Sequence, residues 1–320
     1  MHSAHLSPTL FKGIAMSAAA LIHRLTLSLR ALTLLIVLSA IATSLGAQTN
    51  PAFSVRRAGV RGQRPIVLIP GLFSSGAVWD GTATHLGNSY DLHVLTLAGF
   101  AGIPPAHDKR YFDAERDAII KYIRDEHLNH PILVGHSLGG ALAFAIAATT
   151  PDLVGPLIIV DAVPFLPALT NPAATADASR PMADAMRAGY AAATPAQLAV
   201  QSGPAFRGLM RDTSHLAQAI DWSAHSDPAT VGNAVADMMV TDLRSAVASI
   251  RSAVLLVAAG GAAATTPEVD AVRAAYEAQV ATIPSHTVVV AQGARHFIMF
   301  DAPEFLYQTI DTFLASVAVR

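Results

Sequence analysis

Residues 131–140 read PILVGHSLGG, the stretch of the chain that is most informative about its architecture. An apolar run from Ile132 to Val134 is followed by a glycine-rich turn, which opens directly into a second apolar segment. This order predicts a buried strand, a sharp bend and a helix. Within the bend, Gly135, Ser137 and Gly139 form the pattern G-x-S-x-G. A serine at the centre of such a bend needs a strained backbone, and tiny residues two positions before and after it avoid a collision.

The bend gives Ser137 two candidate roles. It precedes a helix from Leu138 to Thr149, whose first backbone N–H groups can hold a developing negative charge beside the hydroxyl. Alternatively, Ser137 only caps that helix. The strand before the bend and the apolar helix after it are the context in which G-x-S-x-G marks a nucleophile, so we favour the first role.

Short apolar runs rich in β-branched residues recur along the rest of the chain. They are residues 66–69, 92–97, 132–134, 157–160, 254–258 and 287–290. Hydrophobicity that is continuous rather than alternating suits strands covered on both faces, which favours a mainly parallel sheet. Helical patterns separate the runs, so we expect a doubly wound α/β fold whose folded part begins near Ala58.

One interval interrupts the alternation of strands and helices. Residues 163–250 contain no strand of comparable quality, and helix-favouring stretches punctuated by proline dominate there. Roughly 90 residues is far more than a crossover connection needs. We therefore predict a helical cap at 163–250, inserted into a core formed by 64–162 and 251–320.

The N-terminus has the pattern of an export signal. Residues 31–43 read ALTLLIVLSAIAT, with Arg24 and Arg30 ahead of them and small residues behind. We interpret residues 1–47 as a signal peptide or an uncleaved anchor of an exported, periplasmic or secreted protein, with translation starting at Met1 or Met16. Membrane contact is expected only through this segment if it is not cleaved. The polar, basic residues 48–63 follow as a linker or an edge segment.

Composition excludes several classes of function. The formal net charge of −2 gives no reason to expect a nucleic-acid partner. The chain has no cysteine, and its 13 histidines show no spacing typical of a metal site. We expect no metal and no cofactor.

A histidine near the C-terminus completes a reactive pair. Residues 293–303 read GARHFIMFDAP and place His296 between the last apolar run and the last helical pattern. An imidazole in this loop can act as general base for Ser137.

With these motifs, the chain resembles the α/β-hydrolase superfamily, particularly its capped esterase-like and haloalkane-dehalogenase-like branches, over residues 64–314. The resemblance implies that the backbone N–H groups of Leu72 and Leu138 form an oxyanion hole. Gly71, in the stretch IPGLFSSGAVWD at 69–80, matches the family pattern. Pro70 departs from it, because the family usually has histidine there.

The position of the catalytic acid also departs from the family. Most members carry an Asp or Glu after the strand that corresponds to 254–258, but here residues 259–266 read AGGAAATT. Some dehalogenases and lipases of this fold use an acid one strand earlier, where this chain has Asp161. We therefore favour Asp161 as the residue that orients His296, over a Ser–His dyad or a cap carboxylate such as Asp242.

These residues predict a serine hydrolase. A serine nucleophile argues against dehalogenase or epoxide hydrolase chemistry, because the relatives with those activities attack with an aspartate. The expected reaction is hydrolysis of a small to medium apolar carboxylic ester through an acyl-enzyme. Amide, lactone and thioester substrates remain open, as does cofactor-free perhydrolysis. Apolar cap residues could line its pocket: Phe165, Leu166, Met182, Met186, Phe206, Leu209, Met210, Met238 and Met239. The alternative is a small-molecule receptor on a hydrolase scaffold, for which the empty acid position is the main support.

Overall fold

The described part of the chain forms a seven-stranded sheet in the order β1-β3-β2-β4-β5-β6-β7. The computed structural model describes residues 52–105 and 110–318. The strands are β1 (Phe53–Gly59), β2 (Pro65–Ile69), β3 (Asp91–Leu97), β4 (Ile132–His136), β5 (Leu157–Val160), β6 (Val254–Ala259) and β7 (His286–Ala291). All neighbours pair in parallel except β1, which pairs antiparallel with β3. The predicted doubly wound, mainly parallel sheet is confirmed.

The edge strand β1 was not among the predicted strands, and the folded part begins before Ala58. Phe53 is buried, whereas the basic residues that follow it are partly or fully exposed. Arg57 reaches back to the Asp91 carboxylate with two 2.9 Å contacts. An edge strand that pairs on one side tolerates such polar residues, so its composition resembles that of a linker. The expected leader at 1–47 lies outside the described residues and stays a prediction.

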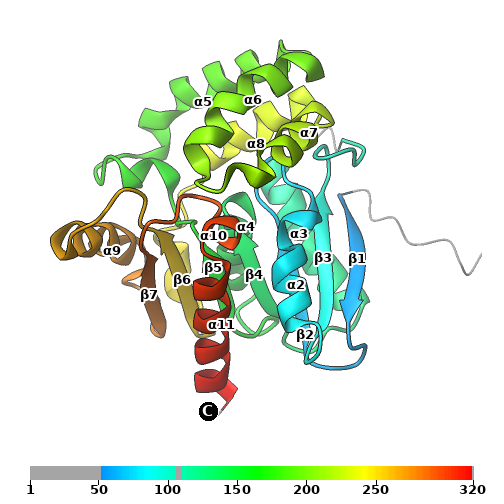
Figure 1. Cartoon of the computed structure of the whole chain (residues 1–320), viewed down its shortest axis with the longest axis vertical. Coiled ribbons are helices and arrows are strands. Elements are labelled where there is room, and N and C mark those ends of the chain that lie inside the picture. Colours follow the sequence, from blue (N-terminus) through cyan, green and yellow to red (C-terminus); the bar gives the residue numbers. More distant parts are fainter. Residues whose placement is uncertain (1–51, 106–109, 319–320) are drawn as a thin grey trace, which may run out of the picture. The chain divides into compact units, whose positions relative to one another are not determined.

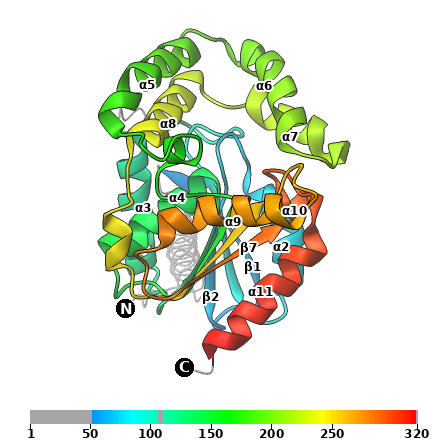
Figure 2. The same cartoon turned by 90° about the vertical axis from the view of Figure 1, so that its left-hand side faces the viewer.

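Helices cover both faces of the sheet (Figure 2). They include α2 (Asp80–Leu86), α3 (Tyr111–Asp125), α4 (Leu138–Thr149), α9 (Thr266–Val280), α10 (Ile298–Asp301) and α11 (Pro303–Ala318). Seen edge-on, α3 and α4 lie on one side of the sheet, and α2 and α11 lie on the other. The central strands are therefore buried on both faces, as their continuous hydrophobicity predicts.

Between β5 and β6 the chain forms helices that lie beyond the carboxyl ends of the parallel strands (Figure 1). They are α5 (Ala176–Ala191), α6 (Pro195–Leu209), α7 (Leu216–Ala224) and α8 (Pro228–Val240), with short 3₁₀ helices at Leu166–Leu169, Thr213–His215 and Ala246–Ser249. Local signals explain their starts: the Thr194 and Gln197 side chains form a capping box before α6, and Asp227 caps α8. The assignment of 163–250 as a separate cap domain stays a prediction.

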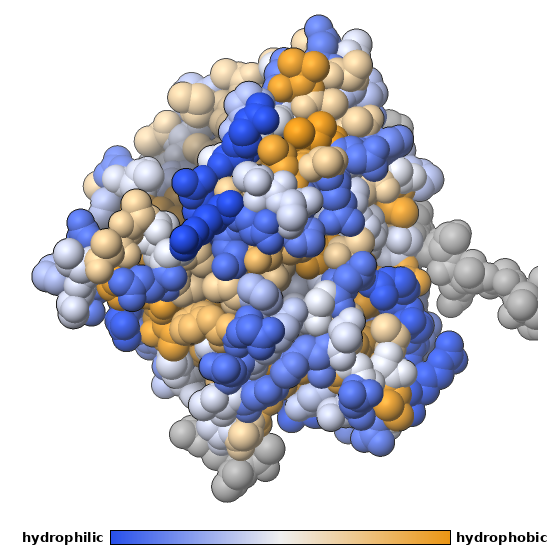
Figure 3. Space-filling view, in the orientation of Figure 1, coloured by the Kyte–Doolittle hydropathy of each residue, from blue (hydrophilic) through white to orange (hydrophobic). Residues whose placement is uncertain are grey.

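The surface near these helices carries exposed apolar side chains. In the view of Figure 3, apolar side chains gather over the upper helices, while the lower part is mostly hydrophilic. Met182 on α5 is 60% exposed, and Val200 on α6 is 77% exposed. Across residues 52–105 and 110–318, we find no helix with the length and apolar character needed to span a bilayer.

Candidate active site

Ser137 lies in the bend between β4 and α4 with a left-handed backbone, at φ 53° and ψ −118°. Residues other than glycine rarely adopt this region, and the conformation stores strain. The surrounding hydrogen bonds hold it: the Ser137 N–H donates to the Val160 carbonyl at 3.1 Å, and its own carbonyl accepts from Ala141. The Ser137 side chain makes no capping hydrogen bond to α4. Capping is therefore not its role in this structure.

The two glycines of the motif are required by close backbone contacts. A Cβ atom on Gly135 would lie 2.3 Å from the Gly139 carbonyl oxygen. A Cβ atom on Gly139 would lie 2.2 Å from the Ile69 carbonyl oxygen, on the neighbouring strand β2. No side chain fits at these separations, which agrees with the steric reason for the pattern.

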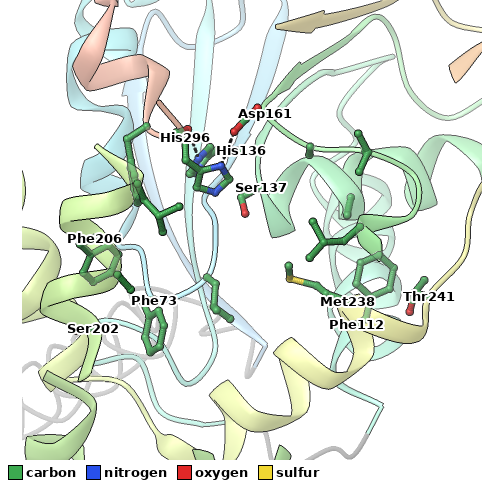
Figure 4. Close-up of a pocket in the computed structure, with 18 of the residues that line it drawn as sticks. Phe73, Phe112, His136, Ser137, Asp161, Ser202, Phe206, Met238, Thr241 and His296 are labelled. Atoms are coloured by element: carbon green, nitrogen blue, oxygen red, sulfur yellow. Dashed lines mark hydrogen bonds and ion pairs between the residues drawn. The ribbon is translucent and has the colours of Figure 1, made fainter. Parts of the chain in front are cut away.

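His296 and Asp161 meet at the carboxyl edge of the sheet (Figure 4). Asp161 directly follows β5, His296 lies between β7 and α10, and the His296 Nδ1 is 2.6 Å from the Asp161 Oδ2. Figure 4 shows Ser137 beside the His296 ring. The structure thus brings together the nucleophile, base and acid expected from the sequence.

Two other carboxylates, the cap residue Asp242 and Glu268 in the first turn of α9, are engaged elsewhere. Asp242 pairs with its neighbour Arg244. Glu268 caps α9 by accepting from the backbone N–H groups of Ala264 and Thr265. Neither carboxylate contacts His296.

The Asp161 carboxylate is almost fully buried, with its side chain 8% exposed. Burial raises its pKa, but hydrogen bonds from His296, Tyr276 and the Ala259 N–H, together with the His296 charge, hold that pKa below its ordinary value. Asp161 is therefore ionised at neutral pH and can stabilise a protonated His296.

Two further residues of the site were not predicted from the sequence. Tyr276 on α9 donates to the Asp161 Oδ1 at 2.6 Å. His136, in the second position of the motif, has its Nε2 3.0 Å from the His296 carbonyl oxygen. Burial lowers the pKa of His136 to about 3, with a smaller contribution from His296, so the ring is neutral and its Nε2–H donates to that carbonyl. The position of His136 beside Ser137 was the only available signal.

The loop expected to form the oxyanion hole packs against Ser137. A Cβ atom on Gly71 would lie 3.1 Å from the Ser137 Cβ and 2.9 Å from the His136 Nδ1. Leu72 directly follows Gly71 in the chain, and Leu138, the first residue of α4, directly follows Ser137. Among the described residues, neither of their N–H groups donates to a backbone or side-chain acceptor. Pro70 is therefore compatible with a loop whose donors remain available.

A cavity of about 420 Å³ opens onto Ser137 and His296. Its walls are mainly apolar, and two of its lining residues, Leu166 and Leu209, are each 39% exposed. Of the apolar cap residues expected to line a pocket, the ones that do so are Leu166, Phe206, Leu209 and Met238. The other five do not line it: Met182 is exposed, Phe165 and Met210 are fully buried, and Met186 and Met239 are partly buried outside the lining.

No group of three or more potential metal ligands occurs within the part of the chain that the structure describes.

Comparisons with known proteins agree with this architecture. Pimeloyl-(acyl-carrier protein) methyl ester esterase of Aliivibrio fischeri (strain MJ11) is 32% identical over 99 residues, which are 31% of this chain and 37% of the relative. The sn-1-specific diacylglycerol lipase ABHD11 of Danio rerio is 31% identical over 103 residues, 32% of each chain. The matches thus span about a third of the length of these curated relatives.

Solved structures share the fold over most of their length. A thermophilic esterase from Thermogutta terrifontis aligns with a TM-score of 0.64 and 22% identity, covering 83% of this chain and 93% of that chain. The sequence pattern of the alpha/beta hydrolase family matches residues 66–309. This confirms the resemblance seen in the sequence at the level of the superfamily. The chain belongs to the alpha/beta hydrolase family.

Proposed function

We propose that the protein is a serine hydrolase of carboxylic esters. The observation that carries the proposal is the 2.6 Å contact between His296 Nδ1 and Asp161 Oδ2, beside a serine held on a strained bend at the wall of an apolar cavity. In this proposal Ser137 is the nucleophile, His296 the general base and acid, and Asp161 the residue that orients His296. The family membership and the esterase and lipase names of the curated relatives support it.

The contact to Asp161 gives His296 the tautomer that the reaction needs. With Nδ1–H donating to the carboxylate, Nε2 carries the lone pair and can take the Ser137 proton. The serine oxygen then attacks the ester carbonyl carbon, and the carbonyl oxygen becomes an oxyanion. The Leu72 and Leu138 N–H groups are the proposed donors to this oxyanion.

The remaining steps return the enzyme to its starting state. The carbon–oxygen bond to the leaving alcohol breaks, and that alcohol takes the proton from His296 Nε2. Water then attacks the acyl-serine, gives its proton to His296 and releases the carboxylic acid, while Ser137 recovers its proton.

The cavity lining supports an uncharged, apolar substrate of small to medium size. Apart from the catalytic pair Asp161 and His296 and the buried, neutral His136, the described lining residues carry no titratable acid or base other than the Tyr190 phenol. A charged group on the substrate would lose its hydration there without gaining a partner.

Ester turnover combined with active-site labelling tests the proposal. We expect hydrolysis of p-nitrophenyl esters over a limited range of acyl-chain lengths, and covalent labelling by a fluorophosphonate. Both should disappear in Ser137→Ala and persist in a matched control, Ser89→Ala, whose residue is exposed on the surface.

The receptor alternative makes the opposite prediction. It requires that the wild-type protein hydrolyses no ester of the series and is not labelled. Its main support in the sequence was the missing acid after β6, and the contact between Asp161 Oδ2 and His296 Nδ1 argues against it. Turnover that survives Ser137→Ala would reject the proposed nucleophile.

A further inference from the structure

The Asp161 carboxylate has a complete set of partners on the side that faces away from His296. Its Oδ2 contacts His296 Nδ1 at 2.6 Å. Its Oδ1 accepts from the Ala259 N–H at 2.8 Å and from the Tyr276 hydroxyl at 2.6 Å. Both donors to Oδ1 come from the region after β5 in the chain, on β6 and α9.

These donors occupy the region from which the acid would be expected. The stretch 259–266 offers no carboxylate, but its first residue turns its N–H toward Asp161. The helix that follows brings the Tyr276 hydroxyl to the same oxygen. The end of β6 and helix α9 therefore contribute two hydrogen-bond donors to Asp161, although they do not contribute the carboxylate itself.

The Tyr276 side chain is fixed by its helix. Thr265 and Glu268 form a capping box at the start of α9, so the helix has a defined first turn. Toward its end, the Gln279 side chain accepts from the Phe165 N–H at 3.0 Å. Tyr276 itself is only 9% exposed. Because α9 is fixed at both ends and Tyr276 is buried, the Tyr276 side chain has little freedom to move its hydroxyl away from Asp161.

We infer that Tyr276 is a positioning residue for catalysis, which orients the Asp161 carboxylate so that Oδ2 faces His296; this inference rests on the proposed function. Two donors on Oδ1 fix the plane of the carboxylate, because a carboxylate accepts within its own plane along its lone pairs. Burial and the Asp161 charge raise the pKa of Tyr276 above its ordinary value. The phenol therefore keeps its proton and remains a donor across the working pH range.

Tyr276→Phe tests the inference, because it removes the hydroxyl and keeps the ring. We expect kcat to fall about tenfold with KM nearly unchanged, since a charge-assisted hydrogen bond in the catalytic array is lost while the cavity is preserved. The acidic limb of the kcat/KM profile should also shift, because the carboxylate that faces His296 loses one of the two donors that fix its plane.

Two controls separate positioning from a general loss of stability. Tyr122→Phe removes a hydroxyl that contacts His93 at the same distance, 2.6 Å, on the other side of the fold, and should leave kcat and the pH limb unchanged. In an Asp161→Asn background, Tyr276→Phe should cause no further loss, because its effect acts through the carboxylate.

Unchanged kcat and pH limb in Tyr276→Phe would overturn the inference. So would an undiminished loss in the Asp161→Asn background. If Ser137→Ala abolishes turnover while Tyr276→Phe is fully active, only the Tyr276 assignment fails. If Ser137→Ala keeps wild-type turnover, the proposed function fails and the Tyr276 assignment fails with it.

Discussion

Among single residues, the proposed nucleophile Ser137 and the proposed acid Asp161 occupy equivalent places after neighbouring strands. His136 and Val160 are paired in the register of β4 and β5, and Ser137 and Asp161 each follow one of them. Both have left-handed backbones, with φ of 53° and 47°. The two bends place the side chains of Ser137 and Asp161 at the same edge of the sheet, so His296 can lie next to both of them.

The position of the acid leads to a prediction at this scale. Asp161→Asn should lower kcat by about 10³- to 10⁴-fold, because an amide can present its N–H to His296 and stabilise the wrong tautomer. Steady-state kinetics on the best p-nitrophenyl ester measure the effect. Asp242→Asn is the control, since that carboxylate pairs with Arg244. Full activity in Asp161→Asn, or a comparable loss in Asp242→Asn, would contradict the assignment.

The sequence could predict the residues with strong local patterns but not their partners. Ser137 and its glycines were predictable because steric limits on the bend leave few residue types possible. Asp161 followed from the absence of a carboxylate at 259–266, with help from the family resemblance. Tyr276 lies 115 positions from Asp161 in the chain, and no periodicity indicates that its hydroxyl meets that carboxylate.

At the scale of elements, α4 packs so closely on β2 that a glycine is required within its first turn. Gly139→Ala should lower the free energy of unfolding by about 2–4 kcal/mol, because its Cβ would collide with the Ile69 carbonyl. Gly189→Ala on α5 meets no atom within 4 Å and should raise it by about 0.5–1 kcal/mol. Urea unfolding of the two variants checks the contrast. Equal effects would show that α4 can move away from β2.

A second contact between elements joins the loop of His296 to the chain after α6. The Asp301 carboxylate accepts from the N–H groups of Arg211 and Asp212, each at 2.8 Å, and from the Arg295 N–H at 2.7 Å. The Phe297 N–H donates to the Leu209 carbonyl at 3.2 Å beside it. Helix α6, which lines one wall of the cavity, is therefore attached to the loop that carries His296.

Asp301→Ala should release this attachment. Three backbone N–H groups lose their acceptor, and we expect trypsin to cleave after Arg207 or Arg211 several-fold faster and KM to rise. Limited proteolysis followed by mass spectrometry locates the cuts. Asp311→Ala serves as the control, because Asp311 is an exposed residue that contacts only His85 among the described side chains. Identical cleavage rates in the two variants would mean that Asp301 does not restrain this segment.

The elements themselves were predictable to different degrees. Strands buried on both faces have unbroken apolar runs, and all of the predicted runs form strands in the structure. The edge strand β1 lies within residues 48–63, for which the sequence left a linker and an edge segment equally open, because only one of its edges is paired and its arginines face water or ion-pair partners. Which cap residues line the cavity depended on how the helices α5 to α8 are rotated, which the sequence pattern does not determine.

At the scale of the whole molecule, two buried neutral histidines make stability depend on pH. Burial lowers the pKa of His136 to about 3 and that of His93 to about 4, from an ordinary value of 6.5. In mild acid, both histidines are protonated in the unfolded chain but stay neutral in the folded chain. The contribution of these two histidines to the free energy of unfolding should therefore be largest above pH 6.5 and fall as the pH drops toward 4.

Urea unfolding between pH 7.5 and 4.5 measures this dependence. Near pH 5.5 the unfolded chain should bind about one proton more than the folded chain at each of the two histidines, and this difference sets the slope of the free energy of unfolding against pH. His136→Gln and His93→Gln should therefore each reduce that slope by about the contribution of one proton. His127→Asn is the control, because His127 is exposed and its positive φ suits asparagine. A slope unchanged by either buried substitution would show that the acid sensitivity arises elsewhere.

The strained backbone at Ser137 has a consequence for anyone who engineers this protein. Glycine adopts φ 53° without penalty, so Ser137→Gly should make the protein about 1 kcal/mol more stable while removing the reactive oxygen. A library screened only for survival after heating would therefore enrich inactive clones at this codon. Directed evolution of a more durable catalyst needs to score product formation in every round.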